Sequence, residues 1–254
     1  MPETGPDTAP DRAFDLVIFD CDGVLIDSEI ISARMLVEAL AGFGVKIDLP
    51  YVAQHFLGRS YPTVMQTIRT EFGLDLPTEF EDQYRGRLMA AFEAGLRVMP
   101  GVTPVLQSLA LPWCVATSSS PMRARRSLEI AGLAGLVGDG LYTATMVARG
   151  KPAPDLFLHV AASRKVLPER CLVIEDSLNG VRAGKAAGMV VWRFTGGSHL
   201  AGQSLEAPED ARAALNFAAF SDFFALAPAL PQIDPTQFDP TQLDPPQLNP
   251  NRRP

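Results

Sequence analysis

The sequence predicts an α/β fold, with a parallel sheet flanked by helices and an all-helical segment inserted after the first strand. In the second half of the chain, short apolar runs such as Trp113–Thr117 and Val190–Phe194 alternate with helical patterns. Alternation of this kind calls for parallel strands joined by right-handed crossovers. Between about residues 28 and 110, by contrast, the pattern is helical and contains no convincing strand.

The composition is ordinary for a soluble globular protein. The 254 residues are 47% hydrophobic and carry a net charge of −7, which argues against a nucleic-acid-binding surface. Cys21, Cys114 and Cys171 lie in or beside apolar runs, so we expect small core residues in a reducing compartment. Residues 1–12 lack the features of a signal peptide, and no run reaches the roughly 18 apolar residues of a membrane span. We therefore expect a disordered leader at 1–12 and a cytoplasmic protein.

Each expected element follows from its local pattern. A buried run predicts the first strand at about 14–20, and apolar residues three and four apart predict four helices at about 28–43, 50–56, 61–72 and 78–95. The later elements are expected in the order helix 101–109, strand 113–117, helix 121–133, short strand 139–145, helix 155–166, strand 170–174, helix 177–187 and strand 190–194. Residues 213–226 add a last strand and helix, with several phenylalanines docking on the core.

The patterns divide the chain into regions. Residues 13–28 and 96–227 are expected to form the α/β core, and 29–95 a helical domain over the sheet edge. Within residues 228–254, a Gln-x-Asp-Pro unit recurs every five residues from Gln232, with Asn249 in place of Asp in the last unit. This period fits neither a helix nor a strand. We interpret this proline-rich tail as extended or disordered. An inert tail is favoured over a partner-binding one, although each unit offers one apolar residue.

Two acidic residues follow the first strand directly. Asp20 and Asp22 are expected at the carboxyl end of the strand, which is where open α/β sheets bind ligands. Strand alternation places them on one side and Cys21 on the other. Two carboxylates so close together repel one another, and Mg²⁺ relieves the repulsion. The alternative is a simple turn made by Asp22 and Gly23.

Polar groups also mark three later positions along the sheet. Thr117 and Ser118 end a strand, Lys151 lies in a proline-rich loop, and Glu175 with Asp176 ends another strand. Each has a plain structural alternative, namely a helix cap, a surface lysine or an acidic first turn. Together at one sheet edge, they suit phosphoryl transfer. A carboxylate attacks phosphorus, a cation and donors hold the phosphoryl oxygens, and a second acid moves protons.

In this order, the four motifs resemble those of the haloacid dehalogenase superfamily. The resemblance covers about residues 14–200 and is carried by the segments Phe-Asp-Cys-Asp-Gly-Val-Leu-Ile-Asp-Ser, Ala-Thr-Ser-Ser, Gly-Lys-Pro-Ala-Pro-Asp and Ile-Glu-Asp-Ser-Leu-Asn-Gly. Within the superfamily, the chain is similar to the phosphatase and β-phosphoglucomutase branch. This resemblance implies a Rossmann-like parallel sheet core with an inserted all-helical cap domain.

The resemblance also implies roles for the motif residues. Asp20 is the expected nucleophile and Asp22 the general acid/base. Thr117, Ser118 and Lys151 are expected to bind the transferring phosphoryl group.

A magnesium ion is implied as the cofactor. Its expected ligands are Asp20, the backbone carbonyl of Asp22, Asp176 and, beside it, Glu175. The cap is expected to set the substrate, and Arg59, in a segment resembling a substrate loop, is a candidate for a distal anionic group. A solvated arginine is the alternative. His159 is interpreted as structural, and His199, which follows two glycines in a loop that could flank the site, is left without a role.

Several reactions remain open. A Mg²⁺-dependent phosphatase acting on a small sugar or organic-acid phosphate is favoured, with a small phosphorylated metabolite as the partner and phosphorylated sugar acids such as 6-phosphogluconate as the nearest substrate type. The alternatives are phosphoglycolate and a β-phosphoglucomutase-like reaction. Ser32 stands where the mutases carry histidine, and the cap segment 84–87 has arginines in place of a lysine.

Other classes are less well supported. A dehalogenase needs neither Asp22 nor a metal, and a phosphonate hydrolase needs a cap lysine, for which Lys46 is the only candidate. A signalling receiver domain is about half this length, and a non-catalytic partner-binding relative would not need intact motifs. The oligomeric state does not follow from the sequence.

Overall fold

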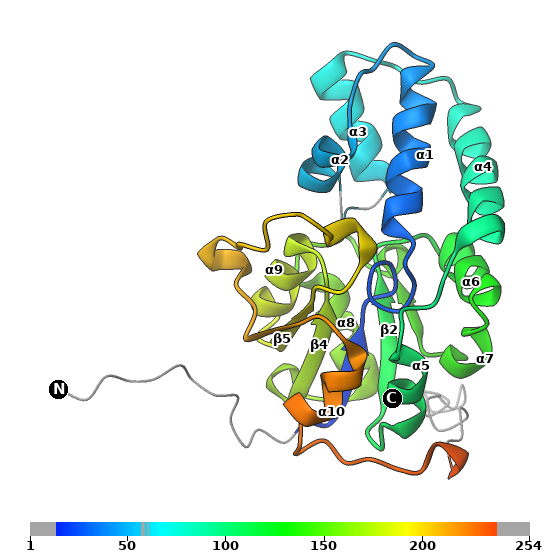
Figure 1. Cartoon of the computed structure of the whole chain (residues 1–254). Helices are drawn as coiled ribbons and strands as arrows, with labels where there is room; N and C mark the ends of the chain where they lie inside the picture. Colours follow the sequence, from blue (N-terminus) through cyan, green and yellow to red (C-terminus); the bar gives the residue numbers. More distant parts are fainter. Residues whose placement is uncertain (1–13, 57–58, 60, 238–254) are drawn as a thin grey trace, which may run out of the picture.

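A computed structural model describes residues 14–56, 59 and 61–237, and Figure 1 shows the chain. Its centre is a six-stranded parallel sheet in the order β3-β2-β1-β4-β5-β6. The strands are β1 Leu16–Phe19, β2 Trp113–Thr117, β3 Leu141–Thr143, β4 Cys171–Glu175, β5 Val190–Phe194 and β6 Leu215–Phe217. The predicted α/β fold with a parallel sheet is therefore confirmed. The expected leader, 1–12, lies outside the described residues.

Both faces of the sheet are covered, which explains the continuous apolar runs of its strands. Side chains of β1 alternate: Val17 and Phe19 enter one core cluster, while Leu16 and Ile18 enter the other. The first cluster lies under α5 Val102–Ser108, α6 Pro121–Ile130, α7 Ala134–Val137 and α10 Phe223–Leu226. The second lies under α8 Asp155–Arg164 and α9 Leu178–Ala186 (Figure 1).

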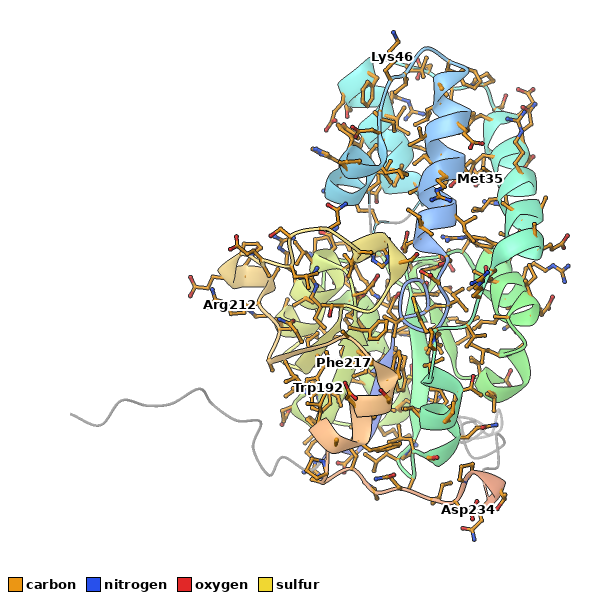
Figure 2. All side chains as sticks on the ribbon, viewed as in Figure 1. Met35, Lys46, Trp192, Arg212, Phe217 and Asp234 are labelled. Carbon is orange, nitrogen blue, oxygen red and sulfur yellow. The ribbon has the colours of Figure 1, made fainter. Side chains whose placement is uncertain are left out.

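The chain after β5 closes the first cluster with aromatic rings. Trp192 and Phe217, labelled in Figure 2, have ring centroids 6.3 Å apart, and Phe220 and Phe223 are buried beside them. The expectation that these phenylalanines dock on the core is confirmed. Short 3-10 helices connect the elements at Ala144–Met146, Pro168–Arg170, Ser198–Leu200, Glu209–Ala211, Phe220–Asp222 and Pro235–Gln237.

Of the helices that lie between β1 and β2 in the chain, all but α5 stand above the sheet in Figure 1. They are α1 Glu29–Ala41, α2 Leu49–His55, α3 Tyr61–Phe72 and α4 Phe80–Gly95. They share an apolar cluster of their own, in which Leu40, Val64 and Ile68 are buried. This is the inserted all-helical unit that the sequence predicts. The residue limits of the two domains, at 28/29 and 95/96, stay a prediction.

The two chain segments that enter and leave this helical unit lie side by side. The backbone N–H of Asp27 donates to the carbonyl of Arg97, and that of Met99 donates to Leu25, each at 2.9 Å. Ile26 and Val98 form an antiparallel bridge between these bonds. The helical unit is thus joined to the core by a short paired ribbon directly beyond the first acidic motif.

The first part of the proline-rich tail is packed against the core, and it contains a turn at 228–230, a bridge at Gln232 and a 3-10 helix at Pro235–Gln237. Residues 228–237 are therefore neither simply extended nor free. Leu230 is buried, and its neighbours Pro231 and Ile233 exchange backbone hydrogen bonds with Ala110 and Ser108. This segment, with Asp234 labelled in Figure 2, runs beneath the end of the sheet opposite the helical unit. Residues 238–254 lie outside the described part. Among the described helices, none has the length and apolar character needed to cross a bilayer.

Candidate active site

The candidate site lies where the sheet order reverses. From β1 the chain passes to β2 and β3 on one side, and β4 returns to the other side of β1. Ligands of open α/β sheets bind outside the strand carboxyl ends at such a switch point. Asp20 and Asp22 follow β1, while Glu175 ends β4 and Asp176 follows it. All four carboxylates are buried, with 1% to 8% of each residue exposed.

Lys151 lies among these acids. Its Nζ donates to Oδ1 of Asp20 and to Oε1 of Glu175, both at 2.6 Å, and to the carbonyl of Ala116 at 3.0 Å. The ring of Phe157 lies 4.9 Å from the same nitrogen. Burial alone would lower the pKa of Lys151, but the two carboxylates outweigh it and raise that pKa. The lysine is therefore held charged, and the loop that carries it is tied to the sheet.

Asp22 has different surroundings. Its Oδ1 accepts hydrogen bonds from Ser28 at 2.6 Å and from Nη2 of Arg123 at 2.9 Å, and its Oδ2 accepts from Ser119 at 2.7 Å. The hydroxyl of Thr117 lies 3.4 Å from Oδ2. Burial would raise the pKa of Asp22, but Arg123 and the three hydroxyls outweigh it and lower that pKa.

The pKa of Asp20 is shifted in the opposite direction from that of Asp22. Burial raises its pKa well above the ordinary aspartate value, and the charges of Glu175, Asp176 and Asp22 add to this, while Lys151 opposes it. Two carboxylates separated by a single residue thus have pKa values pushed apart. Cys21 between them is buried in the apolar core, as the strand alternation predicts. Such divergence is typical of sites where two acids do different work.

Two glycines leave room for the acids of the last motif. A Cβ on Gly23, whose φ is +82°, would lie 2.0 Å from Oδ2 of Asp176. A Cβ on Gly180 would lie 1.7 Å from Oε1 of Glu175. The other oxygen of Glu175 accepts a hydrogen bond from the backbone N–H of Ser177 at 2.9 Å. The glycines of the first and fourth motifs are thus required by close approach to carboxylates.

The donor set fits a magnesium ion. Oδ2 of Asp176 is buried and has no hydrogen-bond partner among the described residues. Burial and nearby acids also raise the pKa of Asp176, as they do for Asp20, so negative charge is undercompensated here. In the described chain, the side chains of His, Cys, Asp and Glu nowhere converge in threes into a ready-made metal cage. Mg²⁺ does not need one, because it binds through one or two carboxylates and keeps several waters.

His199 is a neighbour that sequence reasoning left without a role. Its Nε2 lies 2.9 Å from Oδ2 of Asp176, in a geometry that does not form a hydrogen bond. Burial lowers the pKa of His199, so the imidazole is neutral near pH 7 and the contact is not an ion pair. A Cβ on Gly197 would lie 2.6 Å from the imidazole ring of His199, so the close packing of this ring requires glycine at position 197. The loop is held by Ser198, whose hydroxyl donates to Asp27 at 2.8 Å.

Arg123, Ser119 and Glu29 were missed as site residues. Arg123 is in the first turn of α6, which Ser120 caps and Pro121 begins, and this position directs its side chain back to the sheet edge. The only sequence signal was an arginine six residues beyond Thr117. Glu29 begins α1. Burial, followed by the charges of Asp22 and Asp176, raises its pKa to about 7.

A cavity of about 690 Å³ lies beside the acids and is lined by the helical unit, by α6 and by the loop before Lys151. A second, much smaller cavity of about 20 Å³ is lined by Asp20, Lys151 and the other acids. Five residues line both cavities, namely Glu29, Arg59, Ser118, Ser119 and Arg123. Arg59 is exposed. The structure therefore brings the predicted catalytic, substrate-binding and metal-binding residues to one place, whereas their individual roles stay predictions. They are Asp20, Asp22, Arg59, Thr117, Ser118, Lys151, Glu175 and Asp176.

Comparison with known proteins agrees with this geometry. The haloacid dehalogenase-like hydrolase family matches residues 14–188. The chain is 31% identical over 184 residues to a 6-phosphogluconate phosphatase of Escherichia coli (strain K12), which covers 72% of this chain and 83% of that protein.

Two solved structures share the fold. A haloacid dehalogenase-like protein of unknown function from Agrobacterium tumefaciens (strain C58) has a TM-score of 0.70 and 34% identity, and the match covers 85% of this chain and 99% of that one. A hydrolase of the same family from Deinococcus radiodurans R1, with bound phosphate and sodium, has a TM-score of 0.67 and 34% identity, covering 86% and 97%. The chain belongs to the haloacid dehalogenase-like hydrolase family.

Proposed function

We propose that this protein is a Mg²⁺-dependent phosphatase that hydrolyses a small sugar or organic-acid phosphate. The observation that carries the proposal is the contact of Lys151 with both Asp20 and Glu175 at the switch point, where Asp22 lines the same small cavity. The similarity to a 6-phosphogluconate phosphatase supports the same reaction class. The cavity above the site is of the size that small-molecule sites have.

In the proposed reaction, Asp20 attacks the phosphorus atom. The bond between phosphorus and the ester oxygen breaks, and an aspartyl-phosphate forms. The departing alkoxide takes a proton from Asp22, which must first bind that proton from solvent because its pKa is lowered. Asp22 then takes a proton from water, whose oxygen attacks the phosphorus. This second step releases inorganic phosphate and restores the carboxylate of Asp20. Asp22 thus acts as a general acid in the first step and as a general base in the second.

Other side chains position the reactants. Lys151 orients Asp20 and offers positive charge to the phosphoryl oxygens, and Thr117 with Ser118 offers hydroxyl and backbone donors at the adjacent strand end. The metal would be held by Asp20, the carbonyl of Asp22, Asp176 and, beside it, Glu175. When bound, the ion neutralises charge between the nucleophile and the phosphate oxygens.

Two alternatives lose support from the geometry. Lys46, which a phosphonate hydrolase would need, lies in an exposed loop at the far end of the helical unit in Figure 2. Ser32, at the position where mutases carry histidine, lines the large cavity and accepts a hydrogen bond from Arg123 at 3.1 Å. A serine there does not supply the imidazole expected of a mutase.

Replacing the nucleophile tests the proposal. Asp20→Asn should reduce Mg²⁺-dependent hydrolysis of p-nitrophenyl phosphate by at least about 10³-fold, because an amide cannot form the covalent intermediate. Asp139→Asn changes an exposed aspartate away from the site and should retain wild-type activity. Wild-type turnover by Asp20→Asn would overturn the assignment.

The products separate the remaining reactions. A panel of 6-phosphogluconate, phosphoglycolate and β-glucose 1-phosphate, assayed for free phosphate, identifies the substrate type. Formation of glucose 6-phosphate from β-glucose 1-phosphate, without release of phosphate, would instead support the mutase.

A further inference from the structure

Arg123 stands where the two cavities meet. It lines both the small cavity at Asp20 and the large cavity under the helical unit. About 23% of its side chain is exposed, although its Nε is fully buried. Lys151, by contrast, lines only the small cavity and is itself engaged by Asp20 and Glu175. The two cations therefore face different parts of a bound ester.

The large cavity carries more positive charge than phosphoryl transfer needs. Its charged lining consists of four arginines and two glutamates, namely Arg59, Arg85, Arg123, Arg149, Glu29 and Glu81. Arg85 is paired with Glu81, and Arg149 with Asp155 outside the cavity. Lys151 and the proposed metal already serve the phosphoryl group. Arg123 is paired with Asp22, so the arginines of this cavity outnumber their acids only when Asp22 is protonated, as the general acid of the proposed reaction must be. In that state the cavity favours an additional anion.

The hydrogen bonds of Arg123 do not include a paired, two-nitrogen contact between its guanidinium group and a carboxylate. Nη2 donates to Asp22 at 2.9 Å and to Ser32 at 3.1 Å, and Nη1 donates to Ser119 at 2.8 Å. Nε has no acceptor among the described residues but is fully buried, so a ligand can reach the guanidinium only through its two terminal nitrogens. The contact with Asp22 thus uses one nitrogen, whereas guanidinium groups bind carboxylates and phosphates best through two parallel bonds. The ring of Phe92 lies 5.7 Å from the guanidinium carbon and helps to fix its plane.

We infer that Arg123 selects substrates whose leaving group carries a second anionic group, either a carboxylate or a phosphate. The inference rests on the proposed function, in which Asp22 contacts the ester oxygen that leaves. Because Nη2 of Arg123 is 2.9 Å from Asp22, an anion bound by Arg123 belongs to the leaving group and not to the transferring phosphoryl group. Arg123 is then a specificity-determining residue beside the general acid/base.

Matched esters test this assignment. In the two-carbon series, 2-hydroxyethyl phosphate is neutral at its far end, phosphoglycolate carries a carboxylate there, and ethylene glycol bisphosphate carries a phosphate. In the six-carbon pair, glucitol 6-phosphate and 6-phosphogluconate differ by one carboxylate. The measured quantity is the ratio of kcat/KM for each doubly anionic ester to that for its neutral partner, with p-nitrophenyl phosphate as the reference for basal turnover.

Arg123→Met should lower this ratio by about tenfold or more in at least one series, mainly through KM, because a charged hydrogen bond is lost. Arg123→Lys keeps the positive charge but lacks the planar guanidinium group with its several N–H donors. Its ratio should therefore lie between those of Arg123→Met and the wild type. Arg126→Met is the matched control. Arg126 lies on the same helix, pairs with Glu93 and Glu129, and does not line either cavity. The series that responds shows whether the arginine binds a carboxylate or a phosphate.

The ratio separates selection from a structural role. Arg123 also holds Asp22, so a merely structural effect would slow all esters alike and leave the ratio unchanged. Release of phosphate by the wild type with equal ratios in wild type and Arg123→Met would overturn the inference and leave the proposed function intact. No release from any ester would instead count against the proposed function, and the inference would fall with it.

Discussion

At the scale of single residues, the site separates two aspartates that the sequence places almost side by side. Burial and neighbouring acids raise the pKa of Asp20, while Arg123 and three hydroxyls lower that of Asp22. The first carboxylate is therefore left for a cation, and the second is already compensated by protein donors. For the proposed roles, a cation beside Asp20 would keep that carboxylate ionised and able to attack, whereas Asp22, with its lowered pKa, must take up a proton before it can act as the general acid.

The glycine of the fourth motif gives a prediction at this scale. Gly180→Ala places a methyl group 1.7 Å from Oε1 of Glu175, so the carboxylate must move. Displacing an acid at the proposed metal site should weaken Mg²⁺ binding by about 10-fold to 100-fold. The measurement is activity against Mg²⁺ concentration, and the apparent affinity for Mg²⁺ should fall.

The same substitution elsewhere provides the control. Gly86 lies inside α4, and a Cβ there meets nothing within 4 Å. Gly86→Ala should leave Mg²⁺ activation unchanged and add about 0.5–1 kcal/mol of stability, since alanine favours a helix. Unaltered Mg²⁺ activation in Gly180→Ala would contradict the position assigned to Glu175.

The sequence predicts the motif residues better than their partners. Asp20, Thr117, Lys151 and Glu175 follow strands or precede helices at recognisable points, so the sheet edge gathers them. The contact of Arg123 with Asp22 depends on how α6 is rotated about its axis. A pattern of apolar residues predicts which face of a helix is buried, but it does not predict the rotation closely enough to place a single side chain. His199 contacts Asp176 from a loop, and the sequence of a loop has no hydrophobic pattern from which its path could be predicted.

At the scale of elements, buried strands were predicted most closely. Trp113–Thr117 and Val190–Phe194 have the predicted limits, because both faces of the sheet are covered and the apolar run is the strand. The first strand is Leu16–Phe19 rather than 14–20, and the third is Leu141–Thr143 rather than 139–145. For the third strand, edge pairing rather than hydrophobicity sets the limits, since β3 pairs with β2 alone.

The packing of residues 228–237 against the core could not be predicted from the sequence. A five-residue repeat does not place its apolar residues on one face of a helix or a strand. What holds the segment is non-local. Leu230 fills the first core cluster, and the backbone around Gln232 pairs with the chain that leaves α5. These contacts need the sheet and α5 to be in place before the segment can bind.

Leu230→Ala therefore tests this element. Removing a buried leucine side chain should lower the free energy of unfolding by about 2 kcal/mol or more. Leu205 is 44% exposed, so Leu205→Ala should change it by less than about 0.5 kcal/mol. Urea unfolding followed by circular dichroism measures both. Equal stabilities of the two variants would show that the segment does not contribute to the core.

At the scale of the whole molecule, strand order determines where charge accumulates. The β1–β4 junction is the switch point, and it collects carboxylates from two motifs that are about 150 residues apart in the chain, since β1 and β4 pair directly. The helical unit covers the same end of the sheet (Figure 1), which withdraws these acids from water. The fold thus creates an electrostatic cost that the proposed divalent cation would relieve.

That cost predicts how the stability of the metal-free protein depends on pH. The folded-state pKa values of Asp20 and Asp176 are raised, and that of Glu29 rises from 4.5 to about 7. Above the unfolded-state values, the unfolded chain binds fewer protons than the folded one, so stability falls as pH rises. For Glu29 this window runs from about pH 4.5 to 7. Glu29→Gln should flatten that part of the curve of Tm against pH.

Mg²⁺ should reverse the trend, because it binds the ionised carboxylates in competition with protons. The gain in Tm on adding saturating Mg²⁺ should therefore be larger at pH 8 than at pH 5, since binding to the folded state alone stabilises it. Sodium chloride of matched ionic strength controls for general screening, and Asp176→Asn should lose most of the gain at pH 8 while keeping the salt response. A Mg²⁺ effect that was equal at both pH values, or larger at pH 5, would show that these buried acids are not where the cation binds.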